Sequence, residues 1–392
     1  MINYLKGIHM KTFFKVLLGL ILTVGLFTFA FYRTPAERAF TKNFKLASAG
    51  DAAAAWEVAQ AYQTGNGTKP NLQQALQWYE QAVARGSEQA AWKLYSMYVT
   101  GDGVAANLQT AITYLQIAAQ ANYAPAQEEL GNLYLQGEGV AQHPGQALYW
   151  YITAAENGSS SAKARVDSFS TQEPDLYAKV TRFMQALQEA NKPEASAQYE
   201  VAQAYHKGEA VFASEETAHE WLQKAWETSN GQLPQAAVEL AQQYAQGLGV
   251  EKDEQQAANF WAQAAQLKDP QAQYQMGTLA YAEEPARLED AFAWFSNAAM
   301  QGYAPAQYMT GFMLMQGQGT QASVPLAIRF FEQAADQGDA SAQYVLGQIF
   351  IKGLGVKRSR AKGLQWLEKA AENGNESAQE LLAQVKLLSR RA

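Results

Sequence analysis

A glycine pair between two helical stretches is the first feature of this sequence that suggests ligand binding. Gly137 and Gly139 flank one glutamate, and Gly-x-Gly turns cradle phosphates when they follow a β-strand and open a helix. Here the preceding strand and the six-residue glycine spacing of a dinucleotide site are both missing. The same turn also returns at Gly101, Gly247 and Gly353. Because a ligand loop is normally used once, we interpret the pair as a bend between two helices, where a positive φ stops the first helix.

Side chains suited to acid–base or metal chemistry are few and scattered. His9 precedes the apolar N-terminal run, and His143, His206 and His219 lie far apart, without the spacing of paired metal ligands. The chain has no cysteine, which excludes thiolate nucleophiles, cysteine zinc sites and disulfides. We expect no catalytic residue, no metal and no cofactor, and predict that the protein is not an enzyme. Neighbouring carboxylates are expected on surface helices and turns, at Glu128–Glu129, Glu215–Glu216 and Glu283–Glu284.

Composition indicates a folded helical protein. Of the 392 residues, 48% are hydrophobic and 17% are charged, which is too apolar for a chain that is disordered throughout. The formal net charge is -7, whereas nucleic-acid binding calls for a basic surface that displaces counterions from phosphates. We therefore expect no nucleic acid among the partners.

Residues 1–34 have the character of a membrane segment. Residues 16–32 contain no charge, and Phe13 and Phe14 lengthen the apolar run to residues 13–32 if Lys15 extends toward the interface. A buried helix of a soluble domain is a poor alternative because no polar face interrupts the run. Small residues within residues 28–30 would suit a signal peptidase, but the apolar run continues beyond them. We favour an uncleaved anchor.

Charges around this segment predict its orientation. Lys6, Lys11 and Lys15 precede it, and basic residues beside a span tend to stay in the cytoplasm. We therefore expect the short N-terminal tail in the cytoplasm and the rest of the chain on the other side of the membrane. This charge argument is weakened by four basic residues on the other side of the segment, Arg33, Arg38, Lys42 and Lys45.

Large aromatic residues return at a fixed interval along the rest of the chain. Trp78, Tyr114 and Trp150 are 36 residues apart, and so are Phe330 and Trp366. A fixed period of this size is typical of stacked structural repeats. Between these two groups, the equivalent positions are Ala186, Trp221, Trp261 and Trp294. The chain therefore contains nine units.

Each unit is predicted to contain two helices joined by the glycine turn. In the first helix, apolar residues such as Ala342, Leu346 and Phe350 recur at i, i+4 and i+8. In the second helix, Ala147 and Ala154 likewise share one face. Neither helix can bury its apolar stripe alone, so neighbouring hairpins must stack on one another, as in a solenoid.

The unit A-Q-x-x-L-G-x-x-Y-x-x-G-x-G-V, followed by spaced Ala, Trp and Ala-Ala, resembles the Sel-one-like repeat (SLR), a relative of the tetratricopeptide repeat. It is clearest in residues 126–158 and 342–374, and the resemblance covers about residues 53–374. The resemblance implies an all-α fold: a right-handed α-solenoid of about nine helix-turn-helix repeats that follows the N-terminal transmembrane helix. It also implies an adaptor or scaffold, often at the bacterial cell envelope, with no catalytic residue.

The resulting domain layout has four parts. The membrane segment (1–34) leads without a linker into an N-terminal capping helix (35–52), the SLR solenoid (53–374) and a C-terminal capping helix (375–392). The unit at 159–194 is degenerate because it lacks the glycines. The nine units lie near 53–86, 87–122, 123–158, 159–194, 195–231, 232–269, 270–302, 303–338 and 339–374.

The first helices of the units carry the candidate binding surface. In tetratricopeptide-like solenoids these helices line a concave groove, and an aromatic and amide ladder there suits extended peptides or sugar chains. The alternative is that the aromatics pack between adjacent first helices while the amides hold loops. The candidate groove residues are Trp56, Gln60, Trp92, Ser96, Asn132, Tyr199, Gln203, Gln242, Tyr274, Tyr308, Tyr344 and Gln348.

Two further features stand outside these columns. Trp226 lies beside the long 227–235 connection, where packing is favoured over a role as a binding anchor. A single strongly basic run suits acidic partners, anionic glycans or lipid headgroups, or is simply a solvated loop. This candidate basic patch comprises Lys352, Lys357, Arg358, Arg360 and Lys362.

These features together predict a single-pass protein of the bacterial inner membrane, anchored through residues 13–32, with its solenoid in the periplasm. We expect it to act as a scaffold or regulator whose groove binds other proteins of the cell envelope. The alternative is a glycan-binding module that engages peptidoglycan or an exported polysaccharide.

Overall fold

The computed structural model describes residues 33–389, with side chains placed as far as residue 384. The predicted membrane segment, residues 13–32, lies outside the described residues. Within residues 33–389, no helix combines the length and the apolar character needed to cross a bilayer.

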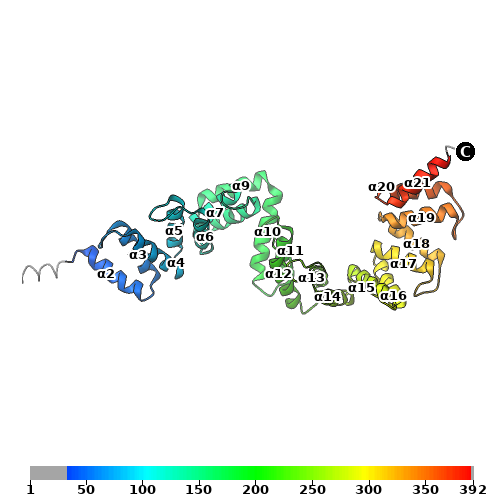
Figure 1. The fold of residues 1–392 in the computed structure, drawn as a ribbon, viewed down its shortest axis with the longest axis horizontal. Helices are drawn as coiled ribbons and strands as arrows, with labels where there is room; N and C mark the ends of the chain where they lie inside the picture. Colours follow the sequence, from blue (N-terminus) through cyan, green and yellow to red (C-terminus); the bar gives the residue numbers. More distant parts are fainter. Residues whose placement is uncertain (1–32, 390–392) are drawn as a thin grey trace, which may run out of the picture. The chain divides into compact units, whose positions relative to one another are not determined.

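The described part of the chain is all-helical and contains no β-strand (Figure 1). Its helices are α2 (Pro35–Ser48), α3 (Ala52–Thr64), α4 (Leu72–Ala84), α5 (Glu88–Thr100), α6 (Leu108–Gln120), α7 (Ala124–Gln136), α8 (Pro144–Glu156), α9 (Ser160–Gln172), α10 (Pro174–Ala190), α11 (Ala195–Lys207), α12 (Glu215–Thr228), α13 (Pro234–Gln246), α14 (Glu254–Gln266), α15 (Pro270–Ala282), α16 (Leu288–Met300), α17 (Ala304–Gln316), α18 (Val324–Asp336), α19 (Ala340–Lys352), α20 (Arg360–Glu372) and α21 (Glu376–Ser389).

These helices form two compact units that meet in sequence between Thr181 and Arg182, within α10. In the first unit, α2 packs against the hairpin α3/α4, the hairpins α5/α6 and α7/α8 follow, and α9 packs against α8. In the second unit, five hairpins follow one another from α11/α12 to α19/α20, and α21 packs against α20. Within each unit, the second helix of a hairpin also contacts the first helix of the next. Each unit is therefore the helical repeat solenoid that the periodicity predicts.

The Gly-x-Gly turns join the two helices of a repeat, as predicted, and the second glycine has an additional role. Gly317 ends α17 in the left-handed conformation, with φ of 69°. Gly319 also has a positive φ, and a Cβ built on it would lie 2.0 Å from the carbonyl oxygen of Leu288, at the start of the preceding second helix. The second glycine of the turn thus allows close contact between consecutive repeats, which the sequence pattern did not show.

Small residues set the distance between the two helices of each repeat. A Cβ built on Gly277 of α15 would lie 2.7 Å from ring atoms of Phe295 in α16, and Gly347 stands in the same relation to Leu367. Around these contacts the cores are local clusters rich in fully buried alanines, such as Ala327 and Ala342. Because dense packing at short range buries the apolar stripes, each repeat forms its core with its own helices and its neighbours.

The glutamine of the Ala-Gln pair ties three helices together. The Nε2 of Gln343 donates to the carbonyl oxygen of Ala335 at the end of α18, at 2.9 Å. The Oε1 of the same side chain accepts a hydrogen bond from Nδ2 of Asn373 at the end of α20, at 2.9 Å. Gln343 is buried, so both bonds are protected from water. The same pair of bonds recurs at Gln127 and Gln307.

The degenerate unit at residues 159–194 folds as α9 and α10. Its first helix ends at Gln172, the capping residue Glu173 is not a glycine, and α10 begins directly after it at Pro174. The following repeat also departs from the pattern, because the Oε1 of buried Gln198 has no hydrogen-bond partner. The helix α12 ends at Ser229, whose hydroxyl donates to the carbonyl oxygen of Trp226 instead. The array is thus least regular on either side of residue 190.

Candidate interaction surfaces

The twelve candidate groove residues occupy equivalent places on the first helices. We call this set, on α3, α5, α7, α11, α13, α15, α17 and α19, the first-helix surface. Every one of the twelve side chains is half-buried, so none belongs wholly to the core and none is fully exposed. Thr278, at the position equivalent to Gln60, is exposed. Each side chain therefore contacts neighbours on one side and remains accessible on the other.

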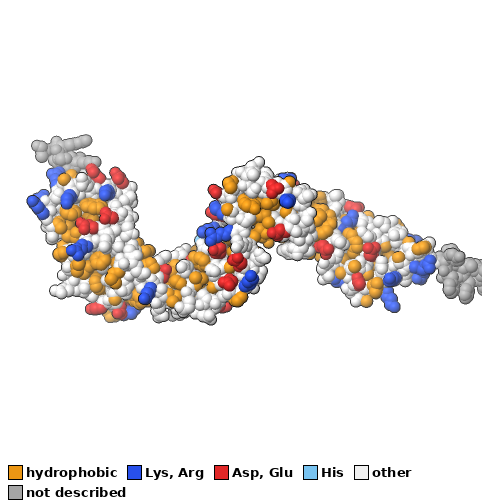
Figure 2. Space-filling model, turned by 180° about the vertical axis from the view of Figure 1, so that it is seen from behind, with side chains coloured by type: hydrophobic (Ala, Val, Ile, Leu, Met, Phe, Trp, Pro, Cys, Tyr) orange, Lys and Arg blue, Asp and Glu red, His pale blue; other side chains and the backbone are white. Residues whose placement is uncertain are grey.

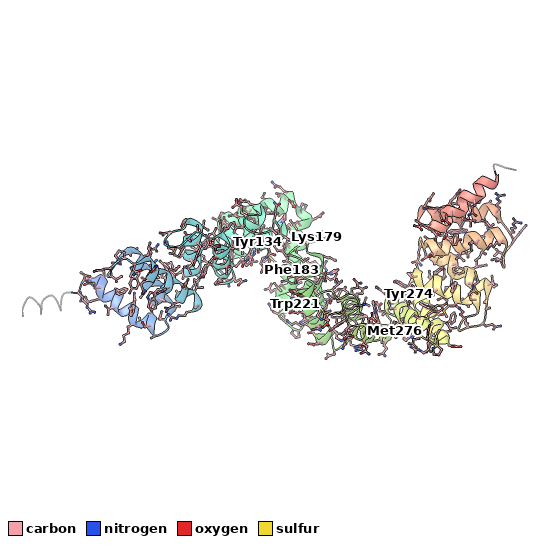
Figure 3. The ribbon with its side chains drawn as sticks, in the orientation of Figure 1. Tyr134, Lys179, Phe183, Trp221, Tyr274 and Met276 are labelled. Atoms are coloured by element: carbon pink, nitrogen blue, oxygen red, sulfur yellow. The ribbon has the colours of Figure 1, made fainter. Side chains whose placement is uncertain are left out.

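Three aromatic members of this surface pack on rings of the second helix of their own repeat. The ring centroids of Trp56 and Tyr79 lie 5.3 Å apart. The corresponding pair Tyr274 and Phe295 lies at 5.5 Å, and Figure 3 places Tyr274 on α15. Tyr308 of α17 packs on Phe331 in the same way, at 5.9 Å. These rings thus pack against the second helix, as the packing interpretation expects. Because they are only half-buried, part of each ring is still accessible to a partner.

Polar bonds join consecutive first helices in both units. In the first unit, the hydroxyl of Tyr95 on α5 donates to Oε1 of Glu129 on α7, at 2.8 Å. In the second unit, Tyr199 and Gln203 of α11 donate to the two carboxylate oxygens of Glu239 on α13. Glu129 and Glu239 hold equivalent positions, three residues after the first alanine of the Ala-Gln column. A carboxylate at this position therefore forms a clasp twice, although the two tyrosine donors hold different positions in their repeats.

The carboxylates at Glu128–Glu129 lie only partly at the surface. Both side chains are half-buried. Glu129 also accepts a hydrogen bond from Asn132, while Glu128 accepts from the hydroxyls of Ser159 and Ser161 at 2.6 and 2.7 Å. Their partners lie a repeat away or in the next turn of the helix, which no local pattern indicates.

Burial changes the acidity of the second clasp. Burial raises the pKa of the Glu239 carboxyl, and the hydrogen bonds from Tyr199 and Gln203 and the nearby charges of His206 and Lys207 oppose that rise. Burial and the hydrogen bond to Glu239 also raise the pKa of the Tyr199 hydroxyl. The clasp is thus most stable when the tyrosine keeps its proton, because its O–H is the donor.

The described histidines have local structural roles. The Nδ1 of His143 accepts from the backbone N–H of Gln146 and caps α8. The Nδ1 of His206 lies 2.9 Å from a carboxylate oxygen of Glu215, and buried His219 is hydrogen-bonded to Gln243. Among the described residues, no group of three or more His, Asp or Glu side chains is arranged to hold a metal ion.

The candidate basic patch lies on the turn between α19 and α20. All five of its side chains are exposed. None of them takes part in the ion pairs found in the described part of the chain. The Nζ of Lys362 lies 5.6 Å from the ring centroid of Phe350. The patch is thus an unneutralised cluster beside an aromatic ring.

Trp226 is a packing residue. It is half-buried between two core clusters. Its ring meets that of Phe260 edge to face, with centroids 6.1 Å apart, and a Cβ built on Gly231 would lie 3.1 Å from it. The tryptophan therefore holds the 227–235 connection against α14.

Comparison with known proteins identifies the repeat. The family model described as Sel1 repeat matches eight segments of the chain, and residues 160–194 of the degenerate unit fall outside them. The matched residues are 52–87, 89–123, 124–159, 195–226, 234–269, 270–303, 304–339 and 340–375.

Solved structures with a similar arrangement include three bacterial proteins. A protective antigen of uropathogenic Escherichia coli that displays an SLR fold is 27% identical, with 89% of this chain and 75% of that chain covered and a TM-score of 0.48. A Sel1 repeat protein of Oxalobacter formigenes is 25% identical, with 88% and 89% covered and a TM-score of 0.44. An immunity protein of Pseudomonas aeruginosa is 27% identical, with 47% and 67% covered and a TM-score of 0.32.

Proposed function

Because this chain belongs to the Sel1 repeat family, we propose that it is a protein–protein interaction scaffold of the bacterial cell envelope. In this proposal residues 13–32 anchor the chain in the inner membrane, and the repeats face the periplasm. The partners are other envelope proteins, which bind the first-helix surface.

The first-helix surface is the observation that supports a binding role. Its aromatic rings are already held by their own repeats, as in the contact between Tyr308 and Phe331. Its amides are partly committed as well, because Nε2 of Gln348 donates to the hydroxyl of Tyr344 at 2.7 Å. A partner that meets these side chains orders few of them on binding, so little conformational entropy is lost.

Crosslinking in intact cells tests this proposal. The variant Gln60→Arg, Ser96→Arg, Gln242→Arg, Thr278→Arg places four long cations on the first-helix surface and leaves the packed aromatic rings in place. We expect it to lose most of the crosslinked proteins that the wild-type chain captures, because the arginines obstruct the surface sterically and electrostatically.

A matched variant controls for added charge and for folding. Gln73→Arg, Gln77→Arg, Gln255→Arg, Gln256→Arg adds the same four cations to exposed positions of α4 and α14. It should retain the crosslinked partners, and both variants should melt at the temperature of the wild-type chain. Equal recovery of partners by both variants would remove the first-helix surface from the proposal.

A glycan is the competing occupant of the same surface. Half-buried aromatic rings next to amides also suit sugar rings, as at Tyr344 and Gln348. Co-sedimentation with purified peptidoglycan sacculi separates the two: a chain that pellets with sacculi, and whose four-arginine variant stays in the supernatant, is a glycan-binding module. A wild-type chain that stays in the supernatant is not.

A further inference from the structure

The last two repeats form an open cleft of about 660 Å³. We call it the C-terminal cleft. It lies on α18, α19 and α20, and its lining includes Glu332, Phe350, Lys362, Trp366, Lys369 and Glu372. Six lining residues belong to α20, and they include Gln365 and Glu368 beside the four named above, so they follow one side of that helix. Figure 2 shows acidic and basic side chains bordering hydrophobic ones at the C-terminal end of the chain.

Lysines lie across the aromatic rings of this cleft. The Nζ of Lys369 is 4.5 Å from the ring centroid of Trp366, and the Nζ of Lys362 is 5.6 Å from that of Phe350. Phe350 and Trp366 are half-buried. Ammonium groups held against apolar surface are less well hydrated than free ones, so a carboxylate that reaches them gains more than at an open surface.

The basic patch continues the cleft at one end, since Lys362 belongs to both. The turn that carries the patch is held in place: the backbone N–H of Ser359 donates to the carbonyl oxygen of Phe350 at 2.8 Å, and a Cβ built on Gly355 would lie 2.4 Å from Val324. The cations therefore sit on a pre-arranged turn, and an anionic partner would relieve their mutual repulsion.

Carboxylates line the cleft as well. Glu372, at the other end, lies ten positions after Lys362 on α20, which is roughly 15 Å along the helix axis, and Glu368 of α20 and Glu332 of α18 also border the cleft. A uniform polyanion such as nucleic acid would be repelled at this end. A flat lipid surface would not fill a concave site. A peptide, whose side chains change from one residue to the next, can match both ends.

We propose that the C-terminal cleft and the adjoining basic patch bind an extended peptide segment of a partner protein, with acidic residues on the patch and an aromatic or long aliphatic side chain in the cleft. This inference rests on the proposed scaffold function and gives it a second surface, separate from the first-helix surface. The acidic residues pair with the cations of the turn, while the apolar side chain covers the rings of Phe350 and Trp366.

Selection from a random 12-residue peptide library displayed on phage tests this proposal. The target is the full-length chain, purified in detergent. We expect the enriched sequences to carry several acidic residues beside an aromatic or aliphatic one. The most enriched peptide is then synthesised with a fluorescent label, and its Kd is measured by anisotropy at physiological and at raised salt.

Three variants locate the bound peptide. Lys357→Glu, Arg358→Glu, Arg360→Glu should raise the Kd by about tenfold or more, since exposed loop charges are reversed without touching the core. Lys69→Glu, Lys163→Glu, Lys192→Glu changes the net charge equally at exposed positions elsewhere and should leave the Kd unchanged. Gln365→Trp, an exposed position on the cleft wall, should fill the cleft and also weaken binding.

Specific outcomes would overturn the proposal. These are enriched peptides without acidic residues, a Kd that is the same for the two charge variants, or capture of the chain by phosphatidylglycerol vesicles in competition with the peptide. The scaffold function is judged separately by crosslinking in cells. If any of these outcomes occurs while the wild-type chain still captures partners in cells, the peptide-binding proposal for the cleft is wrong and the scaffold function stands. If the peptide binds the cleft but no partner is captured in cells, the cleft binds peptide and the scaffold function is wrong.

Discussion

The amide of Gln343 makes two hydrogen bonds that end on two different helices, α18 and α20. A buried amide with both groups satisfied fixes the positions of its neighbours, whereas one with an unpaired atom costs about 1–3 kcal/mol. Gln198 is the exception, because its buried Oε1 lacks a partner. The Ala-Gln pair of the repeat is thus explained at the level of single atoms: alanine packs, and glutamine joins three helices.

Glu239 is the residue for which pH should matter most clearly. Its ordinary pKa is 4.5, and burial raises the pKa in the folded protein. The folded state therefore binds the proton more tightly than the unfolded state does. The resulting contribution to stability is fully present below pH 4.5 and is lost as the pH rises through the folded pKa, so the ionised carboxylate lowers the free energy of unfolding at neutral pH.

In the wild type, protonation of Glu239 should raise the free energy of unfolding as the pH falls from 7 to 4.5. We predict that Glu239→Gln removes this increase. At pH 7 the variant should be as stable as the wild type or more so, because the amide still accepts from Tyr199 and Gln203 can rotate its own amide. Denaturant unfolding at several pH values measures this. The control Glu200→Gln should do the opposite and lose stability at pH 7, since Arg182 lowers the pKa of the Glu200 carboxyl. If the free energy of unfolding depends on pH in the same way in Glu239→Gln and in the wild type, the buried Glu239 carboxyl is not the group responsible.

At the scale of the helix hairpin, the turn decides how closely repeats stack. In repeats that carry the glycine turn, the first helix ends in a left-handed glycine, and the backbone N–H of the residue that caps the second helix donates back to the first, as Ser323 does to the carbonyl oxygen of Leu314 at 2.9 Å. The second glycine of the turn then meets the start of the preceding second helix. Even Gly67 follows this rule, since a Cβ there would lie 2.3 Å from the carbonyl oxygen of Ala36 in α2. The helix α2 therefore stands where a preceding second helix would.

We predict that Gly319→Ala destabilises the second unit by more than Gly338→Ala does. Both glycines have positive φ, 63° and 91°, so both substitutions strain the backbone by about 1 kcal/mol. Only at Gly319 does the new methyl group collide with backbone, the carbonyl oxygen of Leu288, whereas nothing lies within 4 Å of a Cβ on Gly338. Thermal melting of the two variants measures the difference. Equal shifts in Tm would show that a methyl group at Gly319 does not disturb the contact with the preceding repeat, which contradicts this prediction.

At the scale of the whole chain, each repeat contacts its neighbours and little else. The cores are accordingly a series of local clusters, and stability in such arrays is roughly a sum of repeat and interface contributions. The degenerate repeat at 159–194 contains the boundary between the two compact units, and its residues 160–194 lie outside the segments that match the family model. The interruption in the pattern and the division of the chain thus coincide.

The membrane anchor is a prediction about the whole molecule. A C-terminal alkaline phosphatase fusion to the full chain should be active in cells and remain with the membrane pellet after a carbonate wash, because the apolar run of residues 13–32 is long enough to span a bilayer. Deleting residues 1–34 should move the repeats to the soluble fraction and silence the reporter. Activity of a cytoplasm-specific reporter on the full chain would instead reverse the proposed orientation.

The repeat period, the helix pairs and the glycine turns could be predicted from the sequence because they depend on interactions within one repeat. A left-handed glycine, a cap and an apolar stripe each involve residues close in sequence, and the pattern is copied along the chain. The basic run was visible for the same reason, as a contiguous stretch of charge at residues 352–362.

The tertiary structure alone decided which side chains meet across repeats. Tyr199 reaches Glu239 forty residues away, and the C-terminal cleft combines Glu332, Phe350 and Trp366 from three helices. Such partners depend on how far each hairpin rotates and shifts against the next, and that stacking is set by close contacts such as Gly319 against Leu288. Because these distances arise only when neighbouring repeats pack, no spacing within a single repeat encodes them.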